Sequence, residues 1–147
     1  MTENIKCKKL KGNALLPTYG TAYSAGADLY ACLEEDAVIE PGQTLLISTG
    51  IALEIPSGYA GLIYARSGLS TKKGLAPANK VGVIDADYRG EIMVPLYNQS
   101  GERQTVEQGE RIAQLIVTPY LTAVFEETCE LNATQRGEGG FGSTGTK

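Results

Sequence analysis

Residues 44–64 read TLLISTGIALEIPSGYAGLIY and contain three short apolar runs, at 44–48, 51–55 and 59–64. Ser57-Gly58 lies between the second and the third run. Short apolar runs bounded by such turn residues are typical of β-strands. Strands this short and this closely spaced indicate an all-β fold, which would be a sandwich, a jelly roll or a barrel.

The same pattern continues toward the C-terminus, with further strand-like runs at 91–97 and 112–117. Pro95 lies inside the first of them. Because proline cannot donate a ladder hydrogen bond, it predicts an edge position or a bulge. No long stretch shows the 3.6-residue period of an amphipathic helix. We therefore expect one short helix, beginning at Ser67 with that serine as its cap.

The composition is that of a single globular domain. The chain has 147 residues, of which 42% are hydrophobic and 20% charged, and both fractions are ordinary for such a domain. It contains no histidine. This excludes Ser-His-Asp and Cys-His nucleophile systems, histidine-based zinc sites and imidazole acid–base catalysis. A catalytic base must therefore be a carboxylate, a lysine, a tyrosine or a cysteine.

Charge and cysteine usage limit the partners and the compartment. The net charge of -4 argues against nucleic acid as the main partner. Cys7, Cys32 and Cys129 are widely spaced without a C-x-x-C pair, and we interpret them as buried small residues in a reducing compartment. The sequence shows no apolar segment of signal-peptide or membrane-spanning type. We therefore expect a cytoplasmic protein with no membrane partner.

The C-terminus differs in character from the rest. Residues 136–147 carry five glycines, and so glycine-rich a segment buries too little apolar surface to offset its ordering entropy. We expect one β domain over 1–135 and a flexible tail over 136–147. A disordered end is one interpretation of the tail. Arg136 and Phe141 among the glycines favour another, a strap that closes over a phosphate and a base. Residues 137–142 match G-x-G-x-x-G, but a dinucleotide site needs a following helix for which no chain remains.

Two internal segments place a charged side chain among small residues. Residues 25–31, AGADLYA, hold Asp28 in apolar surroundings, where it is either a turn-facing residue or a carboxylate near a metal ion or its waters. Residues 65–70, ARSGLS, lie where a strand should meet the short helix. Backbone N–H groups, a hydroxyl and a guanidinium at such a junction suit a phosphate. A serine cap beside a surface arginine is the alternative.

Two further segments carry polar groups within apolar surroundings. Residues 79–90, NKVGVIDADYRG, are expected to form a hairpin-like turn. A plain hairpin has no use for Asn79 and Tyr88, whereas a loop that presents backbone amides to a flat ligand does. Residues 109–117, GERIAQLIV, place Gln114 within an expected strand. A solvent-facing position is the simpler explanation for that glutamine.

Taken together, these segments and the tail resemble the homotrimeric deoxyuridine triphosphatase (dUTPase) family. The matching stretches are AGADL, RSGL, GVIDADYRGEI, GERIAQL and RGEGGFGSTG, in the family's order and with near-usual spacing. The resemblance implies a jelly-roll-like β-barrel assembled as a homotrimer with shared active sites. It further implies hydrolysis of dUTP to dUMP and pyrophosphate with Mg²⁺, which keeps uracil out of DNA and supplies dUMP for thymidylate synthesis.

The resemblance also implies a role for individual residues. Asp85 stands where the family's general base activates the water that attacks the α-phosphorus, and Asp28 would bind waters of the Mg²⁺ shell. Asn79 and Gly82 would read the uracil edge, and Tyr88 would lie under the deoxyribose. The complete set of substrate-binding positions implied in this way is Arg66, Ser67, Gly68, Asn79, Gly82, Val83, Tyr88, Met93, Gln114, Arg136, Phe141, Gly142, Ser143 and Thr144.

The members of that set divide between base, sugar and phosphates. The phosphates would be held by Arg66, Ser67, Gly68 and Gln114. From the tail, the resemblance implies that Arg136 reaches the γ-phosphate and that Phe141 stacks on uracil. Gly142, Ser143 and Thr144 would then close over the phosphates.

Three alternatives compete with this interpretation. A dCTP deaminase on the same fold would need a glutamate and an arginine at positions that Pro95 and Thr71 occupy here. A non-catalytic nucleotide-binding or regulatory protein would have no need of Asp28, Asp85 and the tail, all of which are intact. A carbohydrate-binding jelly roll would leave the arginine-bearing motifs unexplained.

Overall fold

A computed structural model describes residues 4–140 of the chain. Within that range the fold is all-β apart from one helix of seven residues. The elements, in chain order, are β1 (Lys6–Lys9), β2 (Thr18–Tyr19), β3 (Ala27–Tyr30), β4 (Ala37–Ile39), β5 (Thr44–Ser48), β6 (Ile51–Glu54), β7 (Tyr59–Tyr64), α1 (Ser67–Lys73), β8 (Leu75–Pro77), β9 (Gly82–Ile84), β10 (Met93–Asn98), β11 (Gln104–Val106) and β12 (Arg111–Pro119).

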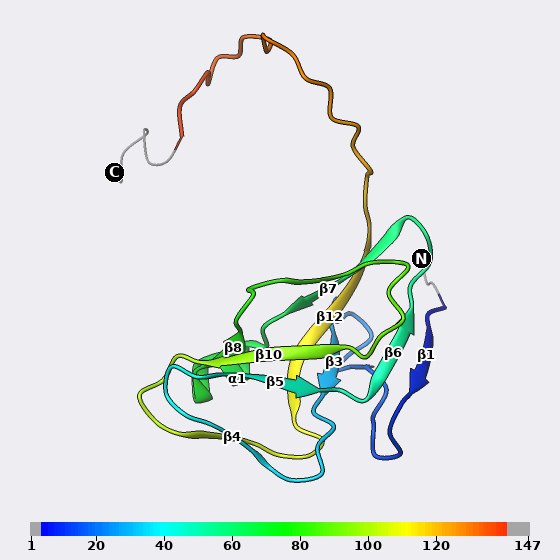
Figure 1. The fold of residues 1–147 in the computed structure, drawn as a ribbon, viewed down its shortest axis with the longest axis vertical. Helices are drawn as coiled ribbons and strands as arrows, with labels where there is room; N and C mark the ends of the chain where they lie inside the picture. Colours follow the sequence, from blue (N-terminus) through cyan, green and yellow to red (C-terminus); the bar gives the residue numbers. More distant parts are fainter. Residues whose placement is uncertain (1–3, 141–147) are drawn as a thin grey trace.

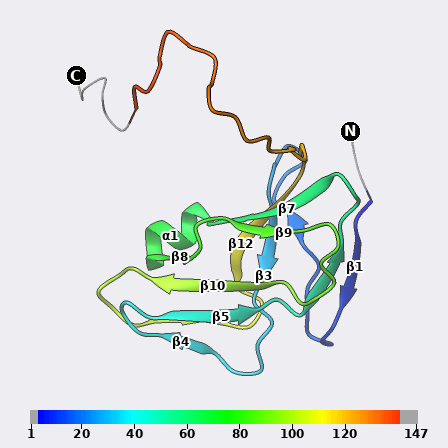
Figure 2. The ribbon, with the colours of Figure 1, turned by 45° about the horizontal axis from the view of Figure 1, so that its top comes forward.

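The strands form four small antiparallel sheets (Figure 1). The largest has the order β2-β3-β12-β7-β9, and a three-stranded sheet has the order β5-β10-β8. The pairs β1-β6 and β11-β4 complete the set. Strands that neighbour one another in space are mostly distant in sequence, as in a jelly-roll-like barrel, and α1 lies beside β8 (Figure 2).

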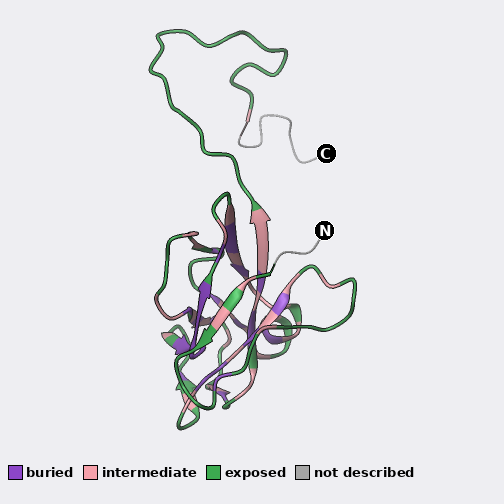
Figure 3. Ribbon diagram, turned by 90° about the vertical axis from the view of Figure 1, so that its right-hand side faces the viewer, coloured by how far each residue is buried: buried purple, intermediate pink, exposed green. Residues whose placement is uncertain are grey.

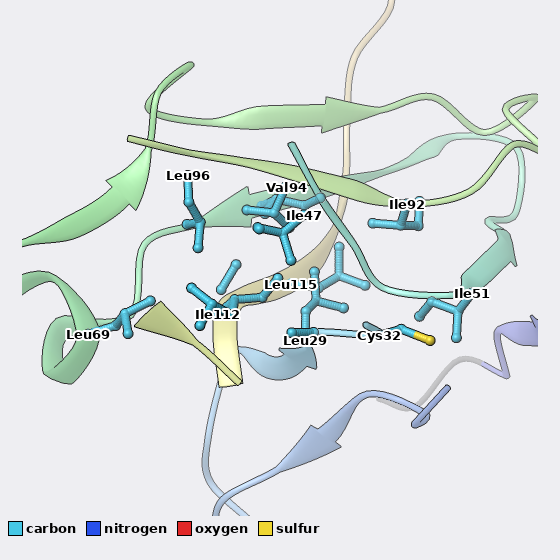
Figure 4. Close-up of a cluster of buried hydrophobic side chains, with 14 of the residues drawn as sticks. Leu29, Cys32, Ile47, Ile51, Leu69, Ile92, Val94, Leu96, Ile112 and Leu115 are labelled. Atoms are coloured by element: carbon cyan, nitrogen blue, oxygen red, sulfur yellow. The ribbon is translucent and has the colours of Figure 1, made fainter. Parts of the chain in front are cut away.

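The core lies between the five-stranded and the three-stranded sheets. Ile47 and Val94 point from the smaller sheet toward Leu29 and Leu115 of the larger one (Figure 4). Strand β3 alternates buried and half-buried positions, as expected for a strand with one face on a core. Each fully buried Leu or Ile contributes about 1.5–3 kcal/mol of transfer free energy. The side chains with 0% exposure are Leu29, Ile39, Leu75, Ile92, Val94, Leu96, Asn98, Val106, Ile112 and Ala113.

The expected all-β architecture with one short helix is confirmed. The prediction that Ser67 is the N-cap of this helix is wrong. Helix α1 begins at Ser67, so that serine is the first helical residue and Arg66 is the N-cap, without a side-chain capping bond. The C-terminal end follows the usual pattern, since Gly74 has φ 65° and its N–H donates to the carbonyl of Ser70.

Pro95 is neither on an edge strand nor in a bulge. Strand β10 is the central strand of its sheet, with Pro95 opposite Leu46 of β5. On the other side the last registered pair is Leu96 with Pro77 of β8. Residue 95 lies just past that pair, and its carbonyl accepts a hydrogen bond from Ala78. The proline is tolerated because its missing donor falls where the β8 ladder ends.

The prediction of a hairpin-like turn over residues 79–90 is also wrong. Strand β9 does not pair with a strand that follows it; it pairs with β7 in the five-stranded sheet. The next strand, β10, belongs to the other sheet. The segment between them, residues 85–92, is therefore a crossing from one sheet to the other.

The chain beyond the last strand leaves the body. Strand β12 ends at Pro119, and residues 120–140 contain no helix or strand and extend away from the domain (Figures 1 and 3). The boundary expected at residue 135 thus stays a prediction. Cys129 lies exposed on this segment, so it was wrong to expect three buried cysteines; Cys32 is buried and Cys7 half-buried. No helix in the described range is long and apolar enough to cross a membrane.

Candidate functional site

The charged motif residues lie in a cavity of about 390 Å³ beside the five-stranded sheet. We call it the arginine pocket. It combines side chains from β3, β12 and the start of α1 with a loop that precedes β3. Its lining is Gly20, Ser24, Ala25, Gly26, Asp28, Arg66, Ser67, Arg111, Gln114 and Ile116.

Asp28 organises the charges of the arginine pocket. Its Oδ1 accepts from Nε of Arg66 at 2.6 Å, and its Oδ2 lies 3.3 Å from Nη1 of Arg111. The carboxylate is largely covered, with 14% of the side chain exposed, whereas Arg111 is 53% exposed. Two guanidinium groups share one carboxylate, so the cluster carries a net positive charge. Such a cluster attracts anions, and guanidinium groups bind phosphate oxygens in pairs.

Gln114 faces the arginine pocket, so the solvent-facing alternative is excluded. Its Nε2 donates to the carbonyl of Ala65 at 2.8 Å. A methyl group at Gly26 would lie 3.1 Å from the Gln114 Cβ and closer still to its Oε1. Strand β12 bulges between Arg111 and Ala113 just before this position. Glycine at 26 therefore leaves room for the close approach of the glutamine, which a larger side chain would displace.

Ser67 and Gly68 begin helix α1 at the edge of this pocket. Ser67 is exposed and lines the cavity. Gly68 does not line it, and a Cβ there would meet nothing within 4 Å. The structure thus places Ser67 with Arg66 and Gln114 and leaves Gly68 beside them.

The candidate base lies in a second cavity, of about 310 Å³, which we call the aspartate pocket. Its lining is Leu46, Val83, Ile84, Asp85, Tyr88, Glu91 and Met93. The carboxylate of Asp85 follows directly after β9 and is exposed. Val83 and Met93 give the pocket exposed apolar walls, with 61% and 36% exposure. Of the two acidic residues in this lining, Glu91 is hydrogen-bonded to Ser48 and Gly50, so Asp85 is the carboxylate that suits a base placed next to a flat organic ring.

Tyr88 is held against the backbone of its own loop. Its hydroxyl donates to the Glu91 carbonyl at 3.0 Å, and its N–H donates to the Asp85 carbonyl at 3.2 Å. A Cβ at Gly90 would collide with the tyrosine hydroxyl and ring. The glycine therefore allows the ring to fold back and form one wall of the pocket.

Asn79 and Gly82 lie close together at the start of β9. A Cβ at Gly82 would come within 3.3 Å of the Asn79 Nδ2 and 3.4 Å of the Ile63 Cβ. The intervening turn includes Lys80 in the left-handed region with φ 65°. Asn79 is exposed, and neither residue lines the two cavities. They adjoin the aspartate pocket through strand β9.

Strand β7 separates the two pockets within one chain. Ile84, next to Asp85, pairs with Gly61, whereas Arg66 follows the opposite end of the strand. The five residue-to-residue steps from 61 to 66 span roughly 16 Å at about 3.3 Å each. The two cavities share no lining residue. A single chain therefore does not bring Asp85 next to Arg66.

Among the described residues of the tail, Arg136 lines neither cavity. Arg136 is exposed, and its Nε donates to the carbonyl of Gly139 at 2.8 Å. It lies on the segment that leaves the body (Figure 3). Phe141, Gly142, Ser143 and Thr144 lie outside the described residues.

Comparison with known proteins accounts for this set of motifs. The dUTPase family profile matches residues 12–145. The chain belongs to the dUTPase family. One relative, the deoxyuridine 5'-triphosphate nucleotidohydrolase of Hydrogenobaculum sp. strain Y04AAS1, is 50% identical over 140 residues, which cover 95% of this chain and 96% of the relative. The enzyme of that name from Acinetobacter baylyi is 52% identical over 133 residues, which cover 90% and 89%.

Solved dUTPase structures share the fold. The dUTPase of Staphylococcus bacteriophage 80alpha, determined with dUPNHPP, is 32% identical with a TM-score of 0.85, covering 98% of this chain and 99% of the phage protein. A mutant dUTPase from phage phi11 of S. aureus, described with a structural Mg(II) ion, is 27% identical with a TM-score of 0.78. That match covers 87% of this chain and 98% of the phage protein.

Two residues of this dUTPase-family site were missed by sequence reasoning. Arg111 stands in the GERIAQL stretch and Glu91 in GVIDADYRGEI, yet neither was given a role. The structure places Arg111 against Asp28 and Glu91 in the aspartate pocket. An arginine directly after the Gly109-Glu110 pair is a weak signal on its own, and the partners of both residues are distant in sequence. Only the fold brings them together.

Proposed function

We propose that this chain hydrolyses dUTP to dUMP and pyrophosphate, by attack on the α-phosphorus of a water activated by Asp85. Membership of the dUTPase family supports the substrate. The observation that carries the proposal is the division of the motif residues into an arginine pocket and an aspartate pocket. One pocket has the charge to hold phosphates, and the other has a carboxylate beside a surface that suits a nucleoside.

The arginine pocket supplies the electrostatics of the reaction. Arg66, Ser67 and Gln114 would hold the phosphates, with Gly68 beside them at the start of α1. Asp28 orients Arg66 through the 2.6 Å contact, so the guanidinium is in place before the substrate arrives. Preorganised positive groups stabilise the charge that grows when water attacks a phosphorus atom.

Asp85 has the role of general base. A carboxylate is a weak base in water, so it removes a proton efficiently only where it is well positioned. The Tyr88 N–H bond to the Asp85 carbonyl, 3.2 Å long, helps to order the residue's backbone. In this proposal the carboxylate takes one proton from the attacking water, and pyrophosphate departs from the α-phosphorus.

The aspartate pocket and strand β9 would select uracil and deoxyribose. The exposed polar groups of Asn79 and the backbone at Gly82 would read the edge of the base, while Val83 and Met93 supply apolar contact. A site that hydrogen-bonds one base leaves buried polar groups unpaired when another base enters, and this discriminates strongly. Tyr88 would lie under the sugar and exclude a 2′-hydroxyl.

Mg²⁺ is the cofactor of the proposal. This ion is usually bound by one or two carboxylates together with waters and substrate phosphates. Among the described residues no group of three or more His, Cys, Asp or Glu side chains could hold a metal alone. Asp28 fits an ion that arrives with the triphosphate, because each carboxylate oxygen has lone pairs beyond those its arginines use. When bound, the ion would offset phosphate charge.

The active site would be shared between subunits of a homotrimer. Since β7 holds the two pockets apart in one chain, an arginine pocket of one subunit would meet an aspartate pocket of another. Exposed apolar side chains on the segment after β12 support contact with other copies; Leu121, Val124, Phe125 and Leu131 are 89–95% exposed in the single chain. Surfaces of this kind are covered in stable assemblies.

The tail would complete the site. Arg136 would reach the γ-phosphate, Phe141 would stack on uracil, and Gly142, Ser143 and Thr144 would close over the phosphates. Closure of such a segment excludes water and commits the substrate. We place the enzyme in the cytoplasm, with dUMP supply and exclusion of uracil from DNA as its role; the free thiols of Cys7 and Cys32 support a reducing compartment.

The test is pyrophosphate release from each common nucleoside triphosphate in the presence of Mg²⁺. We expect release from dUTP, with little from dCTP, dTTP or UTP. Ammonia release from dCTP would instead identify a deaminase. Tight nucleotide binding without turnover would identify a regulatory protein and overturn the proposal.

A further inference from the structure

Glu91 joins the aspartate pocket to a distant turn of the chain. Its Oε1 accepts a hydrogen bond from the Gly50 N–H at 2.8 Å and another from the Ser48 hydroxyl. These partners lie more than forty positions earlier in the sequence. A carboxylate that accepts two such bonds is held in one orientation, because bonds to an ionised acceptor are among the stronger ones in proteins.

The turn that receives Glu91 is itself rigid. Gly50 has φ 67°, and a Cβ there would lie 2.6 Å from the Cys32 sulfur and 2.8 Å from the Ala14 Cβ. Ser48 and Thr49 are buried, with 8% and 1% exposure. The turn is thus pressed against the core and serves as a fixed point.

The backbone of Glu91 contacts the loop of residues 85–92, which carries Asp85. Its backbone carbonyl accepts the Tyr88 hydroxyl at 3.0 Å, and Tyr88 donates in turn to the Asp85 carbonyl. Residues 85–92 have no regular secondary structure. Apart from strand ladders, most hydrogen bonds described for residues 85–91 join residues within this segment. The described bonds that connect it to the rest of the domain are those of the Glu91 side chain. One side chain therefore anchors the loop that carries both Asp85 and Tyr88.

The residue that follows reinforces this anchor. Ile92 is fully buried, its N–H donates to the Ile51 carbonyl at 2.8 Å, and its carbonyl accepts from the Thr49 N–H at 3.3 Å. The backbone of 92 thus stays attached to the turn when the Glu91 side chain is removed. Loss of the carboxylate would loosen the loop without detaching the strand after it.

We propose that Glu91 is a positioning residue, which holds Asp85 at the attack geometry by tying its loop to the Ser48–Gly50 turn. The inference rests on the proposed function, because it gives Glu91 a role in the same hydrolysis. Glu91 acts through the loop and does not take part in the proton transfer. Its removal should therefore lower turnover more than substrate affinity.

The experiment compares the wild-type protein with Glu91→Ala, Glu91→Gln and Ser48→Ala in steady-state hydrolysis of dUTP. Glu40→Ala is the matched control, since Glu40 pairs with Arg103 beside the separate β11-β4 sheet. We expect Glu91→Ala to lower kcat about 10- to 100-fold while KM changes little, because small displacements of a reacting group cost that much. Glu91→Gln keeps an acceptor oxygen and should recover most of the turnover, and Ser48→Ala should lower kcat by a smaller factor.

An unchanged kcat in Glu91→Ala, whether or not KM rises, would overturn the inference. The proposed function would still stand in that case, provided that the wild-type protein hydrolyses dUTP. If Glu91→Ala does not fold, Ser48→Ala decides: a reduced kcat at normal KM supports the role, and a full kcat overturns it. A wild-type protein inactive on dUTP would instead refute the proposed function, and the positioning role would fall with it.

Discussion

At the scale of single residues, the structure changes the interpretation of Asp28. The sequence left it as a turn residue or a carboxylate near a metal, and the resemblance linked it to Mg²⁺ waters. The carboxylate has a further role, since it pairs with Arg66 and Arg111 from two different elements. Removal of Asp28 would leave two guanidinium groups without a shared anchor. If Asp28 also binds the waters of Mg²⁺ as proposed, metal binding and arginine orientation would be coupled at this residue.

Asp85→Asn tests the base at this scale. The amide keeps the shape of the side chain but cannot accept the proton, so we expect kcat to fall about 10²- to 10⁴-fold. Binding of dUTP should stay close to that of the wild type, as measured by calorimetry. Asp87→Asn is the control, because Asp87 lies exposed in the same loop and should keep full turnover. Normal hydrolysis by Asp85→Asn would contradict the assignment.

Cys32 predicts a dependence of stability on alkaline pH. Burial raises the pKa of its thiol, and nearby Lys11 opposes the shift only in part. The folded state thus keeps the proton to higher pH than the unfolded state. The stabilisation is complete at neutral pH and is lost as pH rises above about 8.5, where a free thiol ionises.

Urea unfolding at neutral pH and at about pH 9.5 measures this effect. The midpoint should fall more steeply with pH in the wild type than in Cys32→Ala. Cys129→Ala is the control, since Cys129 is exposed, and should behave as the wild type. Equal slopes in all three proteins would show that Cys32 does not contribute.

At the scale of elements, the sequence predicted the strands whose own residues carry the signal. The runs 44–48 and 59–64 coincide with β5 and β7. Strand β1, with the sequence KCKK, has no apolar alternation and forms by pairing with β6. The segment 79–90 has hairpin chemistry but crosses between sheets, because β9 finds its partner in β7. Long-range pairing decides these cases, and local patterns do not encode it.

Site residues follow the same division. The motif stretches singled out Asp85, Arg66 and Gln114, and the structure places these residues in the linings of the two pockets; their roles stay predictions. The anchoring roles of Arg111 and Glu91 depend on partners from other strands and turns. Such contacts become visible only once the strands are placed side by side.

Gly26→Ala tests the packing between β3 and β12. The added methyl would meet the Gln114 side chain, whose Cβ would be 3.1 Å away. The glutamine must then move from the Ala65 carbonyl, and we expect kcat/KM for dUTP to fall by a factor of about ten or more. Gly12→Ala is the control, since a Cβ at Gly12 meets nothing within 4 Å. Equal kcat/KM values for the two variants would show that the close packing of Gly26 against Gln114 does not affect the hydrolysis of dUTP.

At the scale of the whole molecule, the topology separates the arginine cluster from Asp85, the proposed general base. The arginine pocket and the aspartate pocket lie at opposite ends of β7. The segment after β12 extends away from the body (Figure 1), and its apolar side chains are exposed. In an isolated chain the proposed site would be incomplete, and these apolar side chains would stay exposed to water. Assembly into a homotrimer would resolve them together.

Truncation after residue 135 tests the tail at this scale. The shortened protein should fold and assemble as the full chain does, because the described body ends well before this point. Its turnover of dUTP should be low, since closure would no longer occur. Removal of residues 146–147 alone is the control and should leave activity intact. Full activity after the longer truncation would contradict the closing role.

The shared site is tested most directly by mixing two inactive variants, Asp85→Asn and Arg66→Ala. Each damages a different pocket, so random assembly in equal amounts leaves about one site in four with both halves intact in a cyclic homotrimer. The account predicts that co-refolded mixtures regain about a quarter of the wild-type rate of pyrophosphate release from dUTP. Mixtures as inactive as the separate variants would show that each site is built within one chain, and would contradict the account.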